Sequence, residues 1–256
     1  MNKGSYRVRI LGCPVDNLSL EETLGLIDKI IEEKKISQHV VINVNKLLQA
    51  RREPELLKII DSCRIINVDG VPILWAAKIL GVSIKERIAG IDLMDRLLER
   101  AALKGYSVFF LGAEEDIVRK VVKICCVRYP NLKIAGYRNG YWKEEEEKEV
   151  VEYIKQCRPD ILFVAISSPK KEKFLSKYLE EMGIPFVMGV GGAFDVIGGK
   201  TKRAPKWIQR IGLEWFFRLI QEPKRLWKRY LIGNALFLWL VFKEFIKIKI
   251  LKKRSQ

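Results

Sequence analysis

Short apolar runs alternate with longer segments of helical periodicity from residue 6 to about residue 192. The runs are rich in β-branched residues, and they predict buried strands at His39–Asn43, Arg64–Val68, Ser107–Leu111, Ile161–Ile166 and Phe186–Val190. Strands that alternate with helices along a chain form βαβ units, whose strands are parallel. The pattern therefore predicts an α/β fold with a Rossmann-like, mainly parallel sheet flanked by helices.

The helical segments carry recognisable start signals. Ser19 and Glu22 have the spacing of a capping box. An apolar face at helical spacing follows at Leu20, Leu24, Ile27 and Ile31. Similar patterns predict helices at Val71–Leu80 and Asp92–Leu103.

The last 57 residues have a different pattern. Lys200–Pro205 is a basic linker that ends in proline, Trp207–Ile220 has the pattern of an amphipathic helix, and a second helix is expected from Leu226 to Phe242. Its longest apolar run, 235–242, falls short of the ~18 residues of a membrane-spanning helix. We expect residues 1–199 to form a catalytic core and residues 200–256 a helical appendage that binds a membrane surface.

Charge strengthens this division of the chain. Residues 200–256 hold 16 Lys and Arg against 3 Asp and Glu, so they carry 13 of the 16 net positive charges. Such a segment favours a negatively charged partner, either anionic lipid or nucleic acid. Its Trp and Phe side chains lie within aliphatic runs, which suit a bilayer interface better than base stacking. We therefore expect a peripheral membrane protein that does not bind nucleic acid.

The cysteine content indicates a reducing compartment. The five cysteines form no CxxC pair, and Cys63 borders a predicted buried strand. The first residues are charged and lack the apolar core of a signal peptide. We expect the protein to work at the cytoplasmic face of the cell membrane.

Polar or small residues follow most of the predicted strands. Ligands of open parallel sheets bind beyond the carboxyl ends of the strands, where glycine lets phosphates approach the backbone. The strand ends supply Asn43, Asp69, Gly112, Ser167 to Pro169, and Gly189 to Gly192. Tight turns alone would explain any one of them, but together they predict a nucleotide cleft. The run from Gly189 has Phe194 in place of the last glycine of GxGxxG, so a dinucleotide-binding dehydrogenase is disfavoured.

Carboxylates and cations are the remaining candidates for chemistry. The sequence has one histidine, no His/Cys cluster and no DxD motif. It therefore offers few ligands for a metal centre and few residues for a catalytic triad, and we expect no metal and no cofactor. Asp69 is the candidate general base, because burial at a strand end raises a carboxyl pKa. Asp195 is placed to hydrogen-bond a ribose or a base. Helix capping is the alternative role for both residues.

Arginines could neutralise a leaving diphosphate without a metal ion. Arg87 lies beyond the second strand-helix unit, and Arg218, Arg225 and Arg229 lie in the basic segment. The alternative for Arg218, Arg225 and Arg229 is that their side chains contact solvent or lipid and bind no diphosphate.

Several motifs together resemble those of the WecG/TagA/CpsF family of bacterial glycosyltransferases. The similar stretches cover most of the chain in one order: 67–71 with 75–77, 87–94, 108–112, 168–173, 189–195, 203–207, 212–215, 221–223 and 225–226. Single stretches are weak evidence, whereas their combination is specific.

The resemblance implies an inverting, metal-independent transfer of a hexosamine from a UDP-sugar to undecaprenyl-diphosphate-linked N-acetylglucosamine, in teichoic acid or other cell-surface polysaccharide synthesis. It implies that Asp69 is the base and that Arg218, Arg225 and Arg229 close over the diphosphate, and Arg87 stays a further catalytic candidate. It also implies that the loop from Gly189 to Asp195 forms the nucleotide site. We expect substrate to be bound by Asn43, Lys171, Gly189, Gly191, Gly192 and Asp195.

Two departures from the family pattern concern the donor sugar. Val41 stands where the family usually has threonine, and Lys171 stands where it has glutamine. N-acetylmannosamine is the expected sugar, with glucose and N-acetylmannosaminuronic acid as alternatives. A non-catalytic adaptor that binds membranes or nucleic acid, and a homo-oligomer away from the membrane, also stay open.

Overall fold

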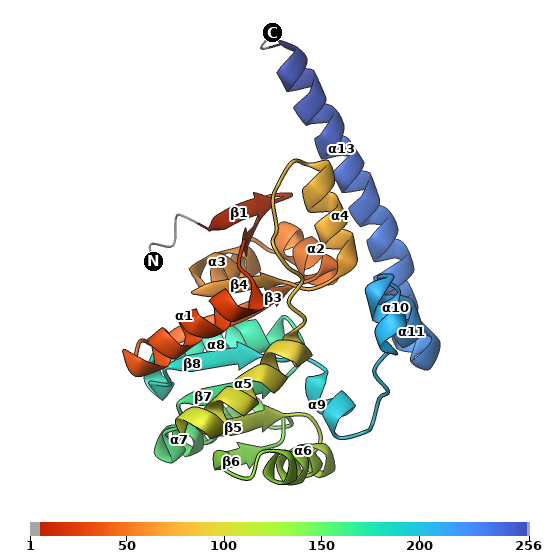
Figure 1. The fold of residues 1–256 in the computed structure, drawn as a ribbon. Coiled ribbons are helices and arrows are strands. Elements are labelled where there is room, and N and C mark those ends of the chain that lie inside the picture. Colours follow the sequence, from red (N-terminus) through yellow and green to blue (C-terminus); the bar gives the residue numbers. More distant parts are fainter. Residues whose placement is uncertain (1–5, 255–256) are drawn as a thin grey trace.

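A six-stranded parallel sheet forms the centre of the molecule in the computed structural model, which describes residues 6–254 (Figure 1). Its spatial order is β4 (Ile65–Val68), β3 (Ser37–Ile42), β8 (Phe186–Gly189), β7 (Ile161–Ala165), β5 (Ser107–Gly112) and β6 (Lys133–Arg138). Every neighbouring pair is parallel. The predicted α/β class and the mainly parallel sheet are confirmed.

The five predicted strands are all present, with ends that differ by at most two residues. The sequence pattern missed β6, an edge strand of half-exposed residues with little apolar contrast. It also missed an antiparallel hairpin of β1 (Arg7–Ile10) and β2 (Cys13–Asp16) that forms a separate small sheet. Asp16 of this hairpin is buried and accepts a hydrogen bond from the backbone N–H of Ile66, which ties the hairpin to β4.

Helices cover both faces of the sheet. One apolar cluster contains residues of α1 (Leu20–Glu32), α5 (Gly90–Lys104), α6 (Glu115–Arg128) and α9 (Ala193–Ile197). Two others contain residues of α2 (Val44–Arg52), α3 (Pro54–Ser62), α4 (Val71–Ile79), α7 (Glu147–Cys157) and α8 (Lys170–Met182). A short 3₁₀ turn, η1 (Glu144–Glu146), precedes α7. Successive strand residues enter opposite clusters, as for Phe109 and Phe110, because side chains alternate along a strand.

The predicted capping box begins α1. The Ser19 hydroxyl accepts from the Glu22 backbone N–H at 3.2 Å, and the Glu22 carboxylate accepts from the Ser19 backbone N–H at 2.8 Å. Two backbone donors that the helix leaves without partners are therefore satisfied.

The C-terminal segment follows the outside of this core as a chain of helices. It contains α10 (Lys206–Arg210), α11 (Glu214–Gln221), α12 (Pro223–Trp227), a π-helical turn η2 (Lys228–Ile232) and α13 (Gly233–Arg254). The prediction of one helix over Trp207–Ile220 is wrong, because the chain turns at Gly212 between α10 and α11. Gly212 has φ +77°, and a Cβ there would lie 2.9 Å from Val71 at the start of α4.

Helix α13 is partly packed and partly exposed. Phe237 and Val241 are buried in the cluster that contains α2 and α4. Leu238, Trp239 and Phe242 are more than half exposed. No helix within residues 6–254 is both long and apolar enough to cross a bilayer. The boundary between 1–199 and 200–256 stays a prediction, and residues 1–5 and 255–256 of those ranges lie outside the described residues.

Two contacts fix the linker against the core. Both terminal nitrogens of Arg203 donate to the Asp92 carboxylate of α5, at 2.6 and 2.7 Å. The Gln221 side chain donates to the carbonyl and accepts from the N–H of Lys202, both at 3.0 Å. The linker is thereby held on α5, and α11 is held on the linker.

We predict that Gly212→Ala loosens this packing. The new Cβ must occupy a left-handed backbone conformation, which costs a non-glycine residue ~1–2 kcal/mol, and it also meets Val71. Hydrogen exchange of amides in 206–221 should accelerate by roughly tenfold or more, while the sheet keeps its protection. Gly199→Ala is the matched control, because Gly199 also has φ +77° but no atom within 4 Å of its Cβ position. Equal acceleration in the two variants would show that the contact with Val71 contributes nothing.

Candidate active site

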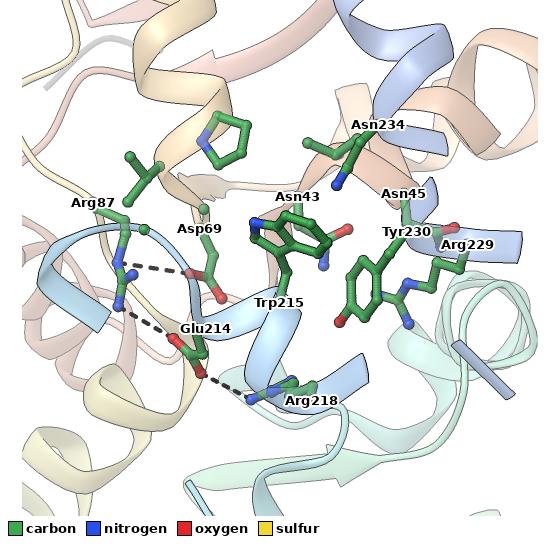
Figure 2. A pocket seen from close by; sticks show the side chains of 15 residues that line it. Asn43, Asn45, Asp69, Arg87, Glu214, Trp215, Arg218, Arg229, Tyr230 and Asn234 are labelled. Carbon is green, nitrogen blue, oxygen red and sulfur yellow. Dashed lines mark hydrogen bonds and ion pairs between the residues drawn. The ribbon is translucent and has the colours of Figure 1, made fainter. Parts of the chain in front are cut away.

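A pocket of about 110 Å³ lies where the carboxyl ends of β3 and β4 meet the C-terminal helices (Figure 2). Its walls come from both parts of the chain: Asn43, Val44, Asn45, Asp69, Gly70, Val71, Pro72, Arg87, Gly212, Glu214, Trp215, Arg218, Arg229, Tyr230 and Asn234. Four predicted catalytic residues, Asp69, Arg87, Arg218 and Arg229, are therefore brought together with Asn43.

Asp69 is held by its neighbours in the sheet. Its backbone N–H donates to the carbonyl of Ile42, and the carbonyl of Val68 accepts from Ile88, both at 2.8 Å. Gly70 turns the chain into α4 with φ +110°, and α4 has no side-chain cap. The Asp69 carboxylate therefore does not cap this helix and is directed into the pocket (Figure 2).

The surroundings of Asp69 raise its pKa. About a third of its side chain is accessible, but the group lies within the pocket wall, and loss of water raises its pKa to about 6. The Arg87 charge opposes this shift in pKa, while the Glu214 charge adds to it. At neutral pH the carboxylate is ionised, with a pKa high enough to accept a proton from a substrate.

A chain of alternating charges joins the core to the C-terminal helices. Arg87 Nε lies 3.9 Å from Asp69 Oδ1, and Arg87 Nη2 lies 3.7 Å from Glu214 Oε2. Glu214 Oε1 in turn accepts from Arg218 Nη2 at 3.1 Å (Figure 2). Glu214 therefore links two arginines that face the same space as Asp69.

Arg229 differs from Arg218 and Arg225, the two other C-terminal arginines that line the hollows. Arg218 is paired with Glu214 and Arg225 with Glu222, whereas no acidic side chain within residues 6–254 pairs with Arg229. Its Nε is buried without a hydrogen-bond partner among the described groups. Desolvation, and then the charges of Arg218 and Arg225, lower its pKa. A group in this state gains most from an anionic ligand.

A second hollow continues from the first. It is lined by Gly192, Asp195, Val196, Thr201, Lys202, Arg218, Gln221, Glu222, Arg225, Leu226, Arg229 and Tyr230. Arg218, Arg229 and Tyr230 are common to both hollows and form the wall between them. The predicted residues Gly192, Asp195 and Arg225 thus lie on the far side of this wall from Asp69.

Asp195 faces the second hollow from α9. Burial raises its pKa, and the Lys200 charge opposes the rise. Its backbone carbonyl accepts from Lys200 and Thr201, which turns the chain out of α9 into the linker. The carboxylate is available to a ligand in this hollow.

Lys171 lies against Gly189, outside both hollows. The Lys171 ammonium is buried 3.4 Å from Glu172, which also pairs with Lys46 at 2.5 Å, and burial lowers the Lys171 pKa to about 8. A Cβ on Gly189 would lie 2.5 Å from Lys171 Cε, so glycine makes room for this side chain. Lys171, Gly189 and Gly191 line neither hollow, and their part in substrate binding stays a prediction.

Several pocket residues were not predicted. Glu214 and Trp215 lie in a stretch that matches the family motifs, so the sequence held a signal for them. Tyr230 and Asn234 lie one and five residues after Arg229, but only the path of the chain reveals that they line the same pocket as Asp69. No cluster of three or more His, Cys, Asp or Glu side chains suited to a metal ion lies within residues 6–254.

Comparison with known proteins agrees with the resemblance seen in the motifs. A model of the glycosyl transferase WecG/TagA/CpsF family matches residues 8–250. A protein of Bacillus subtilis (strain 168) is 34% identical over 219 residues, which are 85% of this chain and 84% of that protein. A protein of Staphylococcus aureus (strain MW2) is 30% identical over 245 residues, 95% of each chain.

Both relatives carry the name N-acetylglucosaminyldiphosphoundecaprenol N-acetyl-beta-D-mannosaminyltransferase. A third protein with this name, from Bacillus spizizenii, is 34% identical over 78% of this chain and 77% of its own length. The match spans the core and the C-terminal helices alike, and this chain belongs to the WecG/TagA/CpsF family of glycosyl transferases.

Proposed function

We propose that this enzyme transfers N-acetylmannosamine from UDP to N-acetylglucosamine linked to undecaprenyl diphosphate, with inversion and without a metal ion. The observation that carries the proposal is that Asp69 lies in one pocket with Arg218 and Arg229 of the C-terminal helices. The relatives named for this reaction cover most of the chain.

The reaction would use Asp69 as its base. Asp69 takes the proton from the acceptor hydroxyl, and the hydroxyl oxygen attacks the anomeric carbon of the donor. The bond from this carbon to the UDP oxygen breaks, and its electron pair leaves with the diphosphate. Attack on the face opposite the leaving group inverts the configuration.

The leaving diphosphate would lie against Arg218 and Arg229, with Arg225 on its far side. Fixed cations that meet a charge as it develops stabilise the transition state. Arg229 supports this assignment, since its Nε is buried without a hydrogen-bond partner and no acidic side chain of the described residues pairs with it. The second hollow then receives the uridine, where Asp195 and the backbone at Gly192 lie within reach of the ribose or the base.

A membrane surface would present the acceptor. The exposed apolar side chains and lysines of α13 suit the interface of an anionic bilayer. We place the enzyme peripherally on the cytoplasmic face, with residues 200–256 both binding lipid and completing the site. Val41 and Lys171 keep glucose and N-acetylmannosaminuronic acid as alternative donor sugars.

Substitution of Asp69 tests the function directly. Wild-type enzyme offered a panel of UDP-sugars and a lipid-linked N-acetylglucosamine acceptor should form product from UDP-N-acetylmannosamine, with kcat/KM rising as pH passes about 6. Asp69→Asn should lower kcat by ~10²–10⁴ and leave UDP binding intact.

The folded state of Asp69→Asn provides the control. A carboxyl whose pKa is raised on folding destabilises the protein above that pKa, so asparagine should not lower the thermal midpoint at pH 8. Near-normal turnover in a folded variant would exclude Asp69 as the base. Absence of transfer from every UDP-sugar by the wild type would contradict the proposed function.

Arg229 provides a separate test of the diphosphate site. Arg229→Gln removes the cation without an acidic partner and should weaken UDP binding by about 10- to 100-fold, the range of one or two charge-assisted hydrogen bonds. Calorimetric titration with UDP measures the loss. Lys224→Gln is the matched control, because Lys224 is exposed on α12 and lines neither hollow. Equal affinity in both variants would place the diphosphate elsewhere.

A further inference from the structure

Two exposed apolar stripes begin at the wall of the pocket. On α4, Val71 lines the pocket, and Trp75 and Ile79 follow it at intervals of four residues on the same side of the helix. Trp75 is 57% exposed and Ile79 is 51% exposed. Exposed apolar side chains that adjoin one another mark interaction sites, whereas scattered ones do not.

Helix α13 repeats this arrangement. Asn234 lines the pocket, and Leu238 and Phe242 follow it at the same spacing, 63% and 61% exposed. Helices α4 and α13 are in contact, and both run from the pocket towards the same end of the molecule (Figure 1). Eight residues of helix cover ~12 Å, so each stripe extends about that far from the pocket.

The side chains change from charged to polar to apolar from Asp69 outward along the two stripes. Asp69 lies at the inner end, Arg229 and Asn234 lie in the pocket wall, and the apolar side chains of the two stripes follow. An acceptor of the proposed kind has the same order, because its sugar hydroxyl is followed by a charged diphosphate and then by hydrocarbon. When the hydroxyl reaches Asp69, the hydrocarbon must leave the pocket along its wall.

We propose that Trp75 and Ile79 of α4, with Leu238 and Phe242 of α13, bind the first isoprene units of the acceptor lipid. This inference rests on the proposed function and assigns a new role to α4, a helix of the core. A surface that served only to touch the bilayer would not need to begin inside the pocket, whereas a binding path for the lipid chain must do so.

The test compares two acceptors in detergent micelles, where no bilayer is present. Both carry N-acetylglucosamine on diphosphate, one with a long polyprenyl chain and one with a short alkyl chain. The double variant Trp75→Gln/Ile79→Gln should lower kcat/KM for the long-chain acceptor about tenfold or more. For the short-chain acceptor it should stay within about twofold of the wild type.

The matched control is Leu103→Gln/Val127→Gln. These side chains of α5 and α6 are 82% and 83% exposed and lie outside both hollows, so the control should change neither rate. The second stripe is tested in the same way by Leu238→Gln/Phe242→Gln.

Three results would overturn the inference. An equal loss with both acceptors would show that α4 affects catalysis or folding. Unchanged selectivity, together with weaker flotation on anionic vesicles that lack acceptor, would show that the stripe contacts the bilayer. Unchanged selectivity and unchanged flotation would show that neither contact exists. By contrast, a wild type inactive on both acceptors with every UDP-sugar would contradict the proposed function itself.

Discussion

Arg87 couples the two halves of the candidate site by charge. Its guanidinium lies 3.9 Å from Asp69 at the end of β4 and 3.7 Å from Glu214 at the start of α11. Only 17% of the Arg87 side chain is exposed, so water screens these contacts weakly. The pKa of the candidate base and the charge of Glu214 on α11 are therefore coupled through the same cation. This coupling explains how a helical segment outside the sheet can take part in chemistry at a strand end.

The parts of the site that lie on the sheet were predictable from the sequence. Parallel strands end at the same edge, so the positions of Asn43 and Asp69 after two apolar runs indicated one cleft, whereas Gly189, which also ends a strand, lines neither hollow. The capping box of α1 was also predictable, because it depends on two residues three positions apart. Edge strand β6 was not predictable from the sequence, since its residues are half exposed and lack a strong apolar pattern.

The parts that depend on distant contacts were not predictable. The break at Gly212 reflects its close approach to Val71, and the path of the linker reflects the pairing of Arg203 with Asp92, 111 residues earlier. Periodicity reports a local preference for helix and carries no information about either contact. For the same reason Glu214 and Tyr230 were not recognised as neighbours of Asp69, although family motifs covered Glu214.

The central claim is that the C-terminal helices complete the environment of the base, and the pH dependence of a Glu214 variant tests it most directly. The Glu214 charge raises the pKa of Asp69, while the Arg87 charge lowers it. In Glu214→Gln the first effect is lost and Arg87 no longer has a carboxylate of α11 beside it. The account predicts that the acidic limb of kcat/KM moves below its wild-type position near pH 6. An acidic limb that stays in place, or moves to higher pH, would contradict it.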